Sequence, residues 1–170
     1  MKKLFALLLA LCMVFALCAC GGDKGTADNG EKVVKIGVFE PASGDSGAGG
    51  KKEMLGMQYA NQETPTVEIG GETYKVELVY SDNGSDSAKA VSAASKLVNE
   101  KVSIVLGSYG SGVSIAASDT FKQAGIPAIG VTCTNPNVTA GNSHYFRICF
   151  LDPFQGSVMA QFAWDMVAAA

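Results

Sequence analysis

The chain has 170 residues and a formal net charge of −3 at pH 7. It is mildly acidic and contains no basic run, so its composition gives no reason to expect a nucleic-acid partner. Three of its five cysteines lie within the first twenty residues, which leaves Cys133 and Cys149 in the rest of the chain. Two cysteines build neither a disulfide framework nor a zinc cluster, and we therefore expect no metal site.

The start of the chain has the features of a bacterial export signal. Two lysines precede an apolar stretch that ends at Leu17 and is shorter than the roughly twenty residues of a transmembrane helix. The sequence Leu-Cys-Ala-Cys-Gly at 17–21 then resembles the lipobox of bacterial lipoproteins. We expect residues 1–19 to be a signal peptide and Cys20 to carry the lipid, because the bulky Leu17 makes Cys18 the poorer candidate. The protein would then be lipid-anchored to the cell membrane on its extracytoplasmic face; the alternative is a plain signal peptide with incidental cysteines.

The rest of the chain divides into a tether and one folded region. Residues 20–31 comprise the lipidated cysteine and a flexible tether, rich in Gly, Asp and Lys and without a large apolar side chain. Residues 32–170 are enough for one core of ordinary size. The chain stops inside a predicted helix, so we expect this region to be a fragment of a longer domain.

The first half of the folded region alternates between strand and helix. The apolar run Val33–Phe39 predicts a buried strand, and methionines at helical spacing predict a helix over Lys51–Gln62. A proline and a Gly-Gly pair predict a surface excursion over Thr64–Thr73. The next strand is predicted over Lys75–Tyr80. A helix over Asp86–Glu100 follows, and its predicted apolar stripe consists of Ala88, Val91, Ala94 and Val98.

The second half repeats the pattern. Its predicted elements are a strand over Val102–Leu106, a helix over Val113–Ala124 ended by Gly125, a strand over Pro127–Val131, a helical turn at Pro136 capped by Asn135, a short segment over Tyr145–Phe150, and a helix from Asp152 with Gln155 placed for a capping box. Strands and helices of these lengths in alternation predict an α/β fold with a doubly wound parallel sheet.

The loops at the carboxyl ends of the predicted strands are the candidate binding site, because ligands bind there near the point where strand order reverses. The loops 40–50, 107–112 and 132–135 are rich in Gly, Ser, Thr and Asn, and we expect no strong acid, base or nucleophile from them. The middle loop leads into a helix N-terminus, whose N–H groups and partial positive charge suit a carboxylate. Thr132 and Thr134 can complete this cradle and accept hydrogen bonds from an ammonium. The alternative is that the middle loop is only a compliant turn.

No group of residues in the sequence predicts catalysis. There is neither a Gly-x-Ser-x-Gly elbow nor a dinucleotide fingerprint, and the Gly-Gly-Lys-Lys run at 49–52 lacks the spacing of a phosphate-binding loop. His144 is interpreted as a surface residue and Arg147 as a packing or surface residue. The threonines beside Cys133 give its thiol no electropositive setting. We therefore expect a binding protein without a cofactor rather than an enzyme.

Several passages together resemble one family. They are KIGVFEPASGDSGAGG, LVYSDNGSDSAKAVSAASKLV, IVLGSYGSGVSIAASD, GIPAIGVTCTNPNVT and FRICFLDPFQG. From Val33 to about Phe162 the chain resembles the first lobe of the type I substrate-binding proteins of ABC importers, in the leucine/isoleucine/valine-binding family. The resemblance implies the first lobe of a two-lobe type I periplasmic-binding-protein fold, which is incomplete here.

The resemblance also implies which residues bind the ligand. The set it gives is Gly110, Ser111, Thr132, Cys133 and Thr134. In it, Ser111 holds a carboxylate, Thr132 and Thr134 supply a backbone and a hydroxyl contact, and the residues Ala48 to Gly50 lie near the ligand side chain. Some members of the family join two of these loops by a disulfide, but the corresponding residues here are Gly84 and Gly110, so that bridge is absent.

The function implied by the resemblance is capture of a small amino acid, foremost a branched-chain one, and its delivery to the permease subunits of an ABC transporter. The membrane would be contacted through the lipid anchor alone. The alternatives are an extracellular sensing domain of the same fold, or binding of amides or urea. Because the second lobe is missing, we expect this chain to bind its ligand far more weakly than a full-length relative.

Overall fold

The structure is a computed structural model that describes residues 31–169; the expected signal peptide, the lipidation of Cys20 and nearly all of the tether lie outside the described residues. A compact unit begins at Lys32. Its elements are β1 (Val33–Glu40), α2 (Gly47–Glu63), β2 (Thr66–Ile69), β3 (Glu72–Asp82), α3 (Ser87–Asn99), β4 (Ile104–Leu106), α4 (Ser111–Gln123), β5 (Ala128–Gly130), the 3₁₀ turn η1 (Pro136–Val138), β6 (Tyr145–Arg147) and α5 (Asp152–Ala168). Within residues 31–169, no helix has the length and apolar character needed to cross a membrane.

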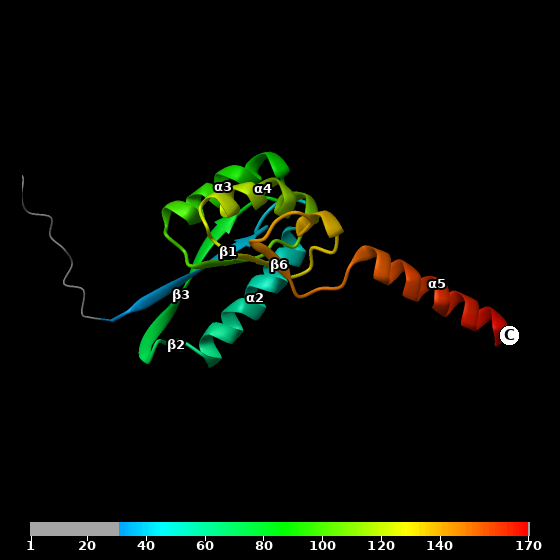
Figure 1. Cartoon of the computed structure of the whole chain (residues 1–170), viewed down its shortest axis with the longest axis horizontal. Coiled ribbons are helices and arrows are strands. Elements are labelled where there is room, and N and C mark those ends of the chain that lie inside the picture. The colour runs from blue at the N-terminus through cyan, green and yellow to red at the C-terminus, as the bar shows by residue number, and fades with distance from the viewer. Residues whose placement is uncertain (1–30, 170) are drawn as a thin grey trace, which may run out of the picture. The chain divides into compact units, whose positions relative to one another are not determined.

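Six strands form one sheet in the order β2-β3-β1-β4-β5-β6 (Figure 1). β1 pairs in parallel with β3 on one side and with β4 on the other, and β5 and β6 extend the parallel sheet beyond β4. The predicted α/β fold with a doubly wound parallel sheet is confirmed for these five strands. The chain adds β3 on one side of β1 and then β4 on the other side, so the strand order reverses at β1. The carboxyl ends of β1 and β4 therefore flank the switch point.

The edge strand β2 departs from the prediction. The segment Thr64–Thr73 lies at the surface as predicted, but it contains a strand, because β2 pairs antiparallel with the start of β3, with Ile69 opposite Glu72. Gly70 and Gly71 form the turn between them, with φ values of 61° and 82°. Two consecutive residues at positive φ match the twist of a two-residue hairpin turn, for which glycine is well suited. The Gly-Gly pair therefore marks a hairpin rather than a loop.

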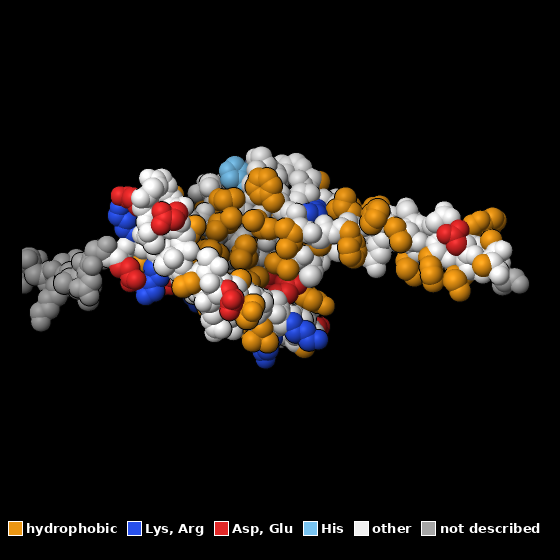
Figure 2. Space-filling model, turned by 90° about the horizontal axis from the view of Figure 1, so that it is seen from below, with side chains coloured by type: hydrophobic (Ala, Val, Ile, Leu, Met, Phe, Trp, Pro, Cys, Tyr) orange, Lys and Arg blue, Asp and Glu red, His pale blue; other side chains and the backbone are white. Residues whose placement is uncertain are grey.

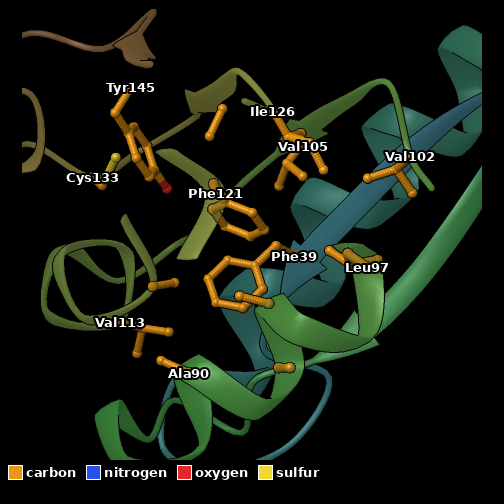
Figure 3. Packing of buried hydrophobic residues seen from close by; sticks show 14 of the residues in the cluster. Phe39, Ala90, Leu97, Val102, Val105, Val113, Phe121, Ile126, Cys133 and Tyr145 are labelled. Atoms are coloured by element: carbon orange, nitrogen blue, oxygen red, sulfur yellow. The ribbon is translucent and has the colours of Figure 1, made fainter. Parts of the chain in front are cut away.

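The main core lies between the sheet and the helices α3 and α4, which lie side by side on the same face (Figure 1). Phe39 of β1 and Phe121 of α4 are fully buried and meet edge to face, with ring centroids 5.4 Å apart (Figure 3). Leu97 of α3 and Val105 of β4 are buried in the same cluster. This packing fixes the two strands whose carboxyl ends flank the switch point.

Local capping contacts set the start of α3 and the end of α4. Asp86 caps α3, and its carboxylate accepts the N–H of Ala88 at 2.8 Å. α4 ends as predicted at Gly125, which has a φ of 69°, while the N–H groups of Gly125 and Ile126 return to the carbonyls of Lys122 and Phe121. This is a Schellman motif, in which glycine tolerates the left-handed conformation without steric cost.

One sequence prediction about α3 is wrong in part, and one about α5 is wrong. In α3, Ala94 of the predicted stripe is buried and Val98 packs against the core, whereas Val91 is 50% exposed. The other buried residues of α3 are Ala90, Ala93 and Leu97. This alanine-rich helix has small apolar residues on more than one side, and packing against α4 and the strands selects the buried one. In α5 the predicted capping box is absent, because Leu151 occupies the N-cap position and no side chain caps the helix.

The opposite face of the sheet and α5 are largely uncovered. α2 lies across this second face and leaves a hollow of about 350 Å³ against the apolar side chains of β1, β3 and β4. Figure 2 shows hydrophobic side chains gathered on this face and along α5. None of the described residues of α5 is buried.

Candidate functional site

The candidate site lies at the carboxyl ends of β1, β4 and β5, as the topology requires. The loop after β4 leads into α4 at Gly110, which is the N-cap residue and has no side chain with which to cap the helix. The N–H groups of the first turn of α4 therefore remain open at this end of the helix. Ser111, the first helical residue, accepts the N–H of Asn135 on its hydroxyl at 3.2 Å. That bond holds the loop after β5 beside the N-terminus of α4, so the predicted site residues of the two loops are brought together.

The three residues predicted in the loop after β5 have different surroundings. Thr132 is exposed, and its hydroxyl donates to the carboxylate of Glu53 and lies 3.3 Å from the carbonyl oxygen of Tyr109. The side chain of Cys133 is fully buried in the core, which raises the pKa of its thiol. Only the backbone of Cys133 can therefore face a ligand, and Thr134 is half-buried at the edge of the loop.

Arg147 organises this loop, a role that the sequence analysis missed. Its guanidinium donates to the carbonyl oxygens of Cys133 at 2.9 Å and Asn135 at 3.0 Å. It also donates to the carbonyl of Pro136 at 3.3 Å and to the hydroxyl of Thr139 at 2.8 Å. The planar group has several donors in a fixed arrangement and can hold successive carbonyls of an irregular segment. Its position on β6 beside that segment was not readable from the sequence.

The expectation that the loops bring no strong acid is wrong for Glu40, the first residue of the loop 40–50, whose carboxyl is buried beneath the loops. Glu40, at the end of β1, is 1% exposed, and its Oε2 accepts the N–H of Tyr109 at 2.8 Å. Burial raises the pKa of Glu40 to about 9, reinforced by the hydrogen bond and the charge of Glu53 and opposed by the Tyr109 N–H. Gly107 makes room for this carboxyl, since a Cβ there would lie 2.6 Å from Glu40 Oε1. An acid ending a buried strand is the signal that could have revealed it.

Asn83 links the loops that follow three neighbouring strands. It is fully buried, and its Nδ2 donates to the carbonyl of Phe39 at 3.2 Å and to the hydroxyl of Ser108 at 3.0 Å. Its Oδ1 accepts the N–H of Ser85 at 3.1 Å. Both cysteines in the described part of the chain are free. The buried amide of Asn83 thus connects β1 and the segments that follow β3 and β4.

The glycines of the first loop are explained by close packing. A Cβ at Gly49 would lie 2.5 Å from the ring of Tyr109, and a Cβ at Gly50 would lie 2.3 Å from the carbonyl oxygen of Pro41. The helix α2 begins at Gly47, four residues before the predicted start. The prediction began later because glycine is a poor helix former, whereas the close contacts of Gly49 and Gly50 leave no room for a side chain. The position of 48–50 near a ligand side chain stays a prediction.

A small polar cavity opens next to the N-terminus of α4. It has a volume of about 170 Å³, and its lining includes Ser46, Ser85, Ser108 and Gly110. The larger apolar hollow under α2 lies on the face of the sheet instead of at the strand ends. The described residues contain no group of three or more His, Cys, Asp or Glu side chains able to hold a metal ion.

A parallel α/β lobe with an open helix N-terminus at its switch point has the general form of a ligand-binding α/β domain. The chain belongs to the periplasmic binding protein family, which matches residues 33–169. It is 33% identical over 166 residues to the Leu/Ile/Val-binding protein homolog 2 of Brucella abortus, and the match covers 97% of this chain and 42% of the relative. The chain thus spans less than half the length of that relative.

Solved structures give the same result. The leucine-binding protein LivK of Thermotoga maritima superposes with a TM-score of 0.73 at 36% identity, covering 80% of this chain and 38% of the other. LivJ of Streptococcus pneumoniae, a branched-chain amino acid transporter substrate-binding protein solved with isoleucine, gives 0.64 at 34% identity over 71% of this chain and 35% of its own. A Rhodopseudomonas palustris solute-binding protein solved with benzoate gives 0.62 at 25% identity, covering 70% of this chain and 33% of that protein.

Proposed function

We propose that this chain is part of a solute-binding protein of an ABC importer that captures a branched-chain amino acid and delivers it to a permease. The relatives with the highest identity cited above are named for leucine, isoleucine and valine. We further propose that a lipid on Cys20 anchors the protein at the extracytoplasmic face of the cell membrane. Replacement of Cys20 by serine should then move the expressed protein from the detergent phase to the aqueous phase in a phase-partition assay.

One observation carries the choice of ligand class: the uncapped N-terminus of α4 lies beside the loop of Thr132 and Thr134, held by the bond between Ser111 and Asn135. The first N–H groups of α4 and the Ser111 hydroxyl suit a carboxylate. Hydroxyl and carbonyl oxygens of the neighbouring loop suit an ammonium. An α-amino acid carries both groups on one carbon atom. It therefore matches a helix N-terminus that offers hydrogen-bond donors beside a loop that offers oxygen acceptors.

The part of the protein beyond this chain would supply the remaining contacts and close over the ligand. Because this chain spans 42% of its Brucella relative, we expect it to hold only part of the site. Closure of two lobes around a ligand shifts the population toward a closed form that a permease can recognise. The isolated chain should accordingly bind leucine weakly.

An NMR titration suits this weak binding and tests the proposal. Leucine should shift the backbone amide signals of Ser111 and Gly112, with a Kd far above that of a full-length relative. Replacement of Ser111 or Thr134 by alanine should weaken binding about tenfold each, since one hydrogen bond to a charged group contributes about 1.5 kcal/mol. Ser118→Ala is the matched control, because this serine of α4 donates to the carbonyl of Ile115, away from the helix N-terminus.

The alternative ligand classes are separated in the same titration. Benzoate is the ligand of one structural neighbour, and amides or urea lack the carboxylate. Shifts with benzoate or urea but none with leucine, isoleucine or valine would reject the amino-acid proposal. Leucine binding as tight by this chain as by a full-length relative would reject the expectation that the site is shared with a missing part.

A further inference from the structure

Two carboxylate oxygens beneath the binding loops are buried without a hydrogen-bond donor. They are Oε1 of Glu40, on β1, and Oε2 of Glu53, on α2. The two carboxyl groups lie within hydrogen-bonding reach of each other. Their other oxygens are occupied: Glu40 Oε2 accepts the N–H of Tyr109, and Glu53 Oε1 accepts the hydroxyl of Thr132. Each carboxyl therefore serves one binding loop and leaves one oxygen for its partner.

No cation among the described residues neutralises this pair. The ion pairs found in residues 31–169 join Lys32 to Glu72 and Lys35 to Glu100, and neither involves Glu40 or Glu53. The lysines nearest in sequence, Lys51 and Lys52 of α2, are exposed.

The other titratable groups around Glu40 remain uncharged or are engaged elsewhere. The hydroxyl of Tyr145 on β6 donates to the carbonyl of Gly107 at 2.7 Å, and burial raises its pKa. Burial also raises the pKa of the Cys133 thiol. The guanidinium of Arg147 donates to loop carbonyls and to Thr139. Two adjacent carboxylates in such a place repel each other at high cost, whereas one proton between them satisfies both free oxygens.

We propose that Glu40 and Glu53 share one proton, and that this hydrogen bond positions α2 and the loops after β4 and β5 around the ligand site. Glu40, the more buried of the two, carries the proton and donates it to Glu53 Oε2, and the pair holds a single negative charge. Its positioning role in ligand binding rests on the function proposed above. Loss of the proton leaves two negative charges in contact, and their repulsion drives α2 away from β1. The hydrogen bonds from the Tyr109 N–H to Glu40 and from the Thr132 hydroxyl to Glu53 are then lost.

Infrared spectroscopy tests the shared proton without reference to any ligand. At pH 7 the wild-type chain should show the carbonyl stretch of a protonated carboxylic acid, and Glu40→Gln should remove it. Glu63→Gln, an exposed residue at the end of the same helix, is the matched control and should leave the band unchanged. A wild-type spectrum without this band at pH 7 would overturn the proposal.

The pH profile of stability gives a second, independent test. An acid whose folded-state pKa is raised contributes stability that is full below its unfolded pKa and is lost as pH rises toward its folded pKa. The amide of Glu40→Gln keeps both hydrogen bonds and cannot ionise. Its melting temperature should therefore exceed that of the wild type by a margin that grows from pH 5 to pH 9. A margin that stays constant over this range would contradict a shared proton.

The positioning role is tested by the conservative variant of the partner residue. Glu53→Ala removes the acceptor of the Thr132 hydroxyl and should weaken leucine binding more than tenfold in the NMR titration, whereas Glu53→Gln should restore it. Equal binding by the wild type and Glu53→Ala would refute the role in positioning. If leucine fails to bind even the wild type, the proposed function fails, and the infrared band and the pH profile still decide whether the proton is shared.

Discussion

Replacement of Asn83 by alanine should cost more stability than any other single polar truncation near the site. The side chain is fully buried and makes hydrogen bonds to Phe39, Ser85 and Ser108. Alanine leaves the carbonyl of Phe39 and the N–H of Ser85 without their partner. Each unsatisfied buried group costs about 1–3 kcal/mol, and partial access of water to the loop of Ser85 reduces the sum, so we expect a loss of about 2–4 kcal/mol.

Urea unfolding followed by far-UV circular dichroism measures this loss. With a slope of about 2 kcal/mol per molar urea, the midpoint should fall by about 1–2 M. Tryptophan fluorescence is the poorer probe, because Trp164 lies on α5 and is 70% exposed. Asn99→Ala, at the exposed end of α3, is the matched control and should change the free energy of unfolding by less than about 0.5 kcal/mol.

The isosteric variant Asn83→Asp sharpens the test. It replaces the donor that faces the carbonyl of Phe39 by an oxygen, and only the protonated acid restores a donor there. Burial raises the folded-state pKa of such an acid, so its stability is retained below its unfolded pKa and lost as pH rises. The variant should be closer to the wild type at pH 4 than at pH 7. An alanine variant within about 0.5 kcal/mol of the wild type, or an aspartate variant with a gap independent of pH, would refute the reasoning.

Two further variants test the backbone and the first loop. Lys101 follows α3 with a φ of 57° in a Schellman motif, so Lys101→Gly should stabilise the fold by about 0.5–1 kcal/mol in urea unfolding, and a loss of stability would contradict this reading. Burial acts to raise the pKa of Asp82, but hydrogen bonds from the Ser43 hydroxyl and from the N–H groups of Gly84, Ala42 and Ser43 outweigh it and lower the pKa. This contribution is present above the unfolded pKa and is lost as pH falls, so the stability gap between wild type and Asp82→Asn should be widest above about pH 5 and narrow toward pH 2. A gap that widens in acid would show that the carboxylate does not hold the loop.

The alternation of strands and helices and the identity of the loops at the strand ends could be predicted from the amino-acid sequence. Apolar runs such as Val33–Phe39 and the cap at Asn135 act over a few residues, and their signals need no distant partner. The placement of Gly110 before a helix and of Thr132–Thr134 after a strand followed from the same local patterns. The resemblance to the leucine/isoleucine/valine-binding family, now supported by the family match, also rested on sequence alone.

The side chains that meet beneath those loops could not be predicted in the same way, because they come from segments far apart in the chain. Glu40 and Glu53 come from a strand and a helix, and Asn83 reaches a carbonyl and a hydroxyl on two other strand ends. Burial and the low dielectric around these groups set the protonation of the carboxyls and the free-energy cost of leaving the amide without partners. Residue spacing predicts neither property. Likewise, the early start of α2 depends on the ring of Tyr109 and on Pro41 packing against glycines that a local propensity rule assigns to a loop. Long-range contact decided these points because each depends on residues that only the folded sheet brings together.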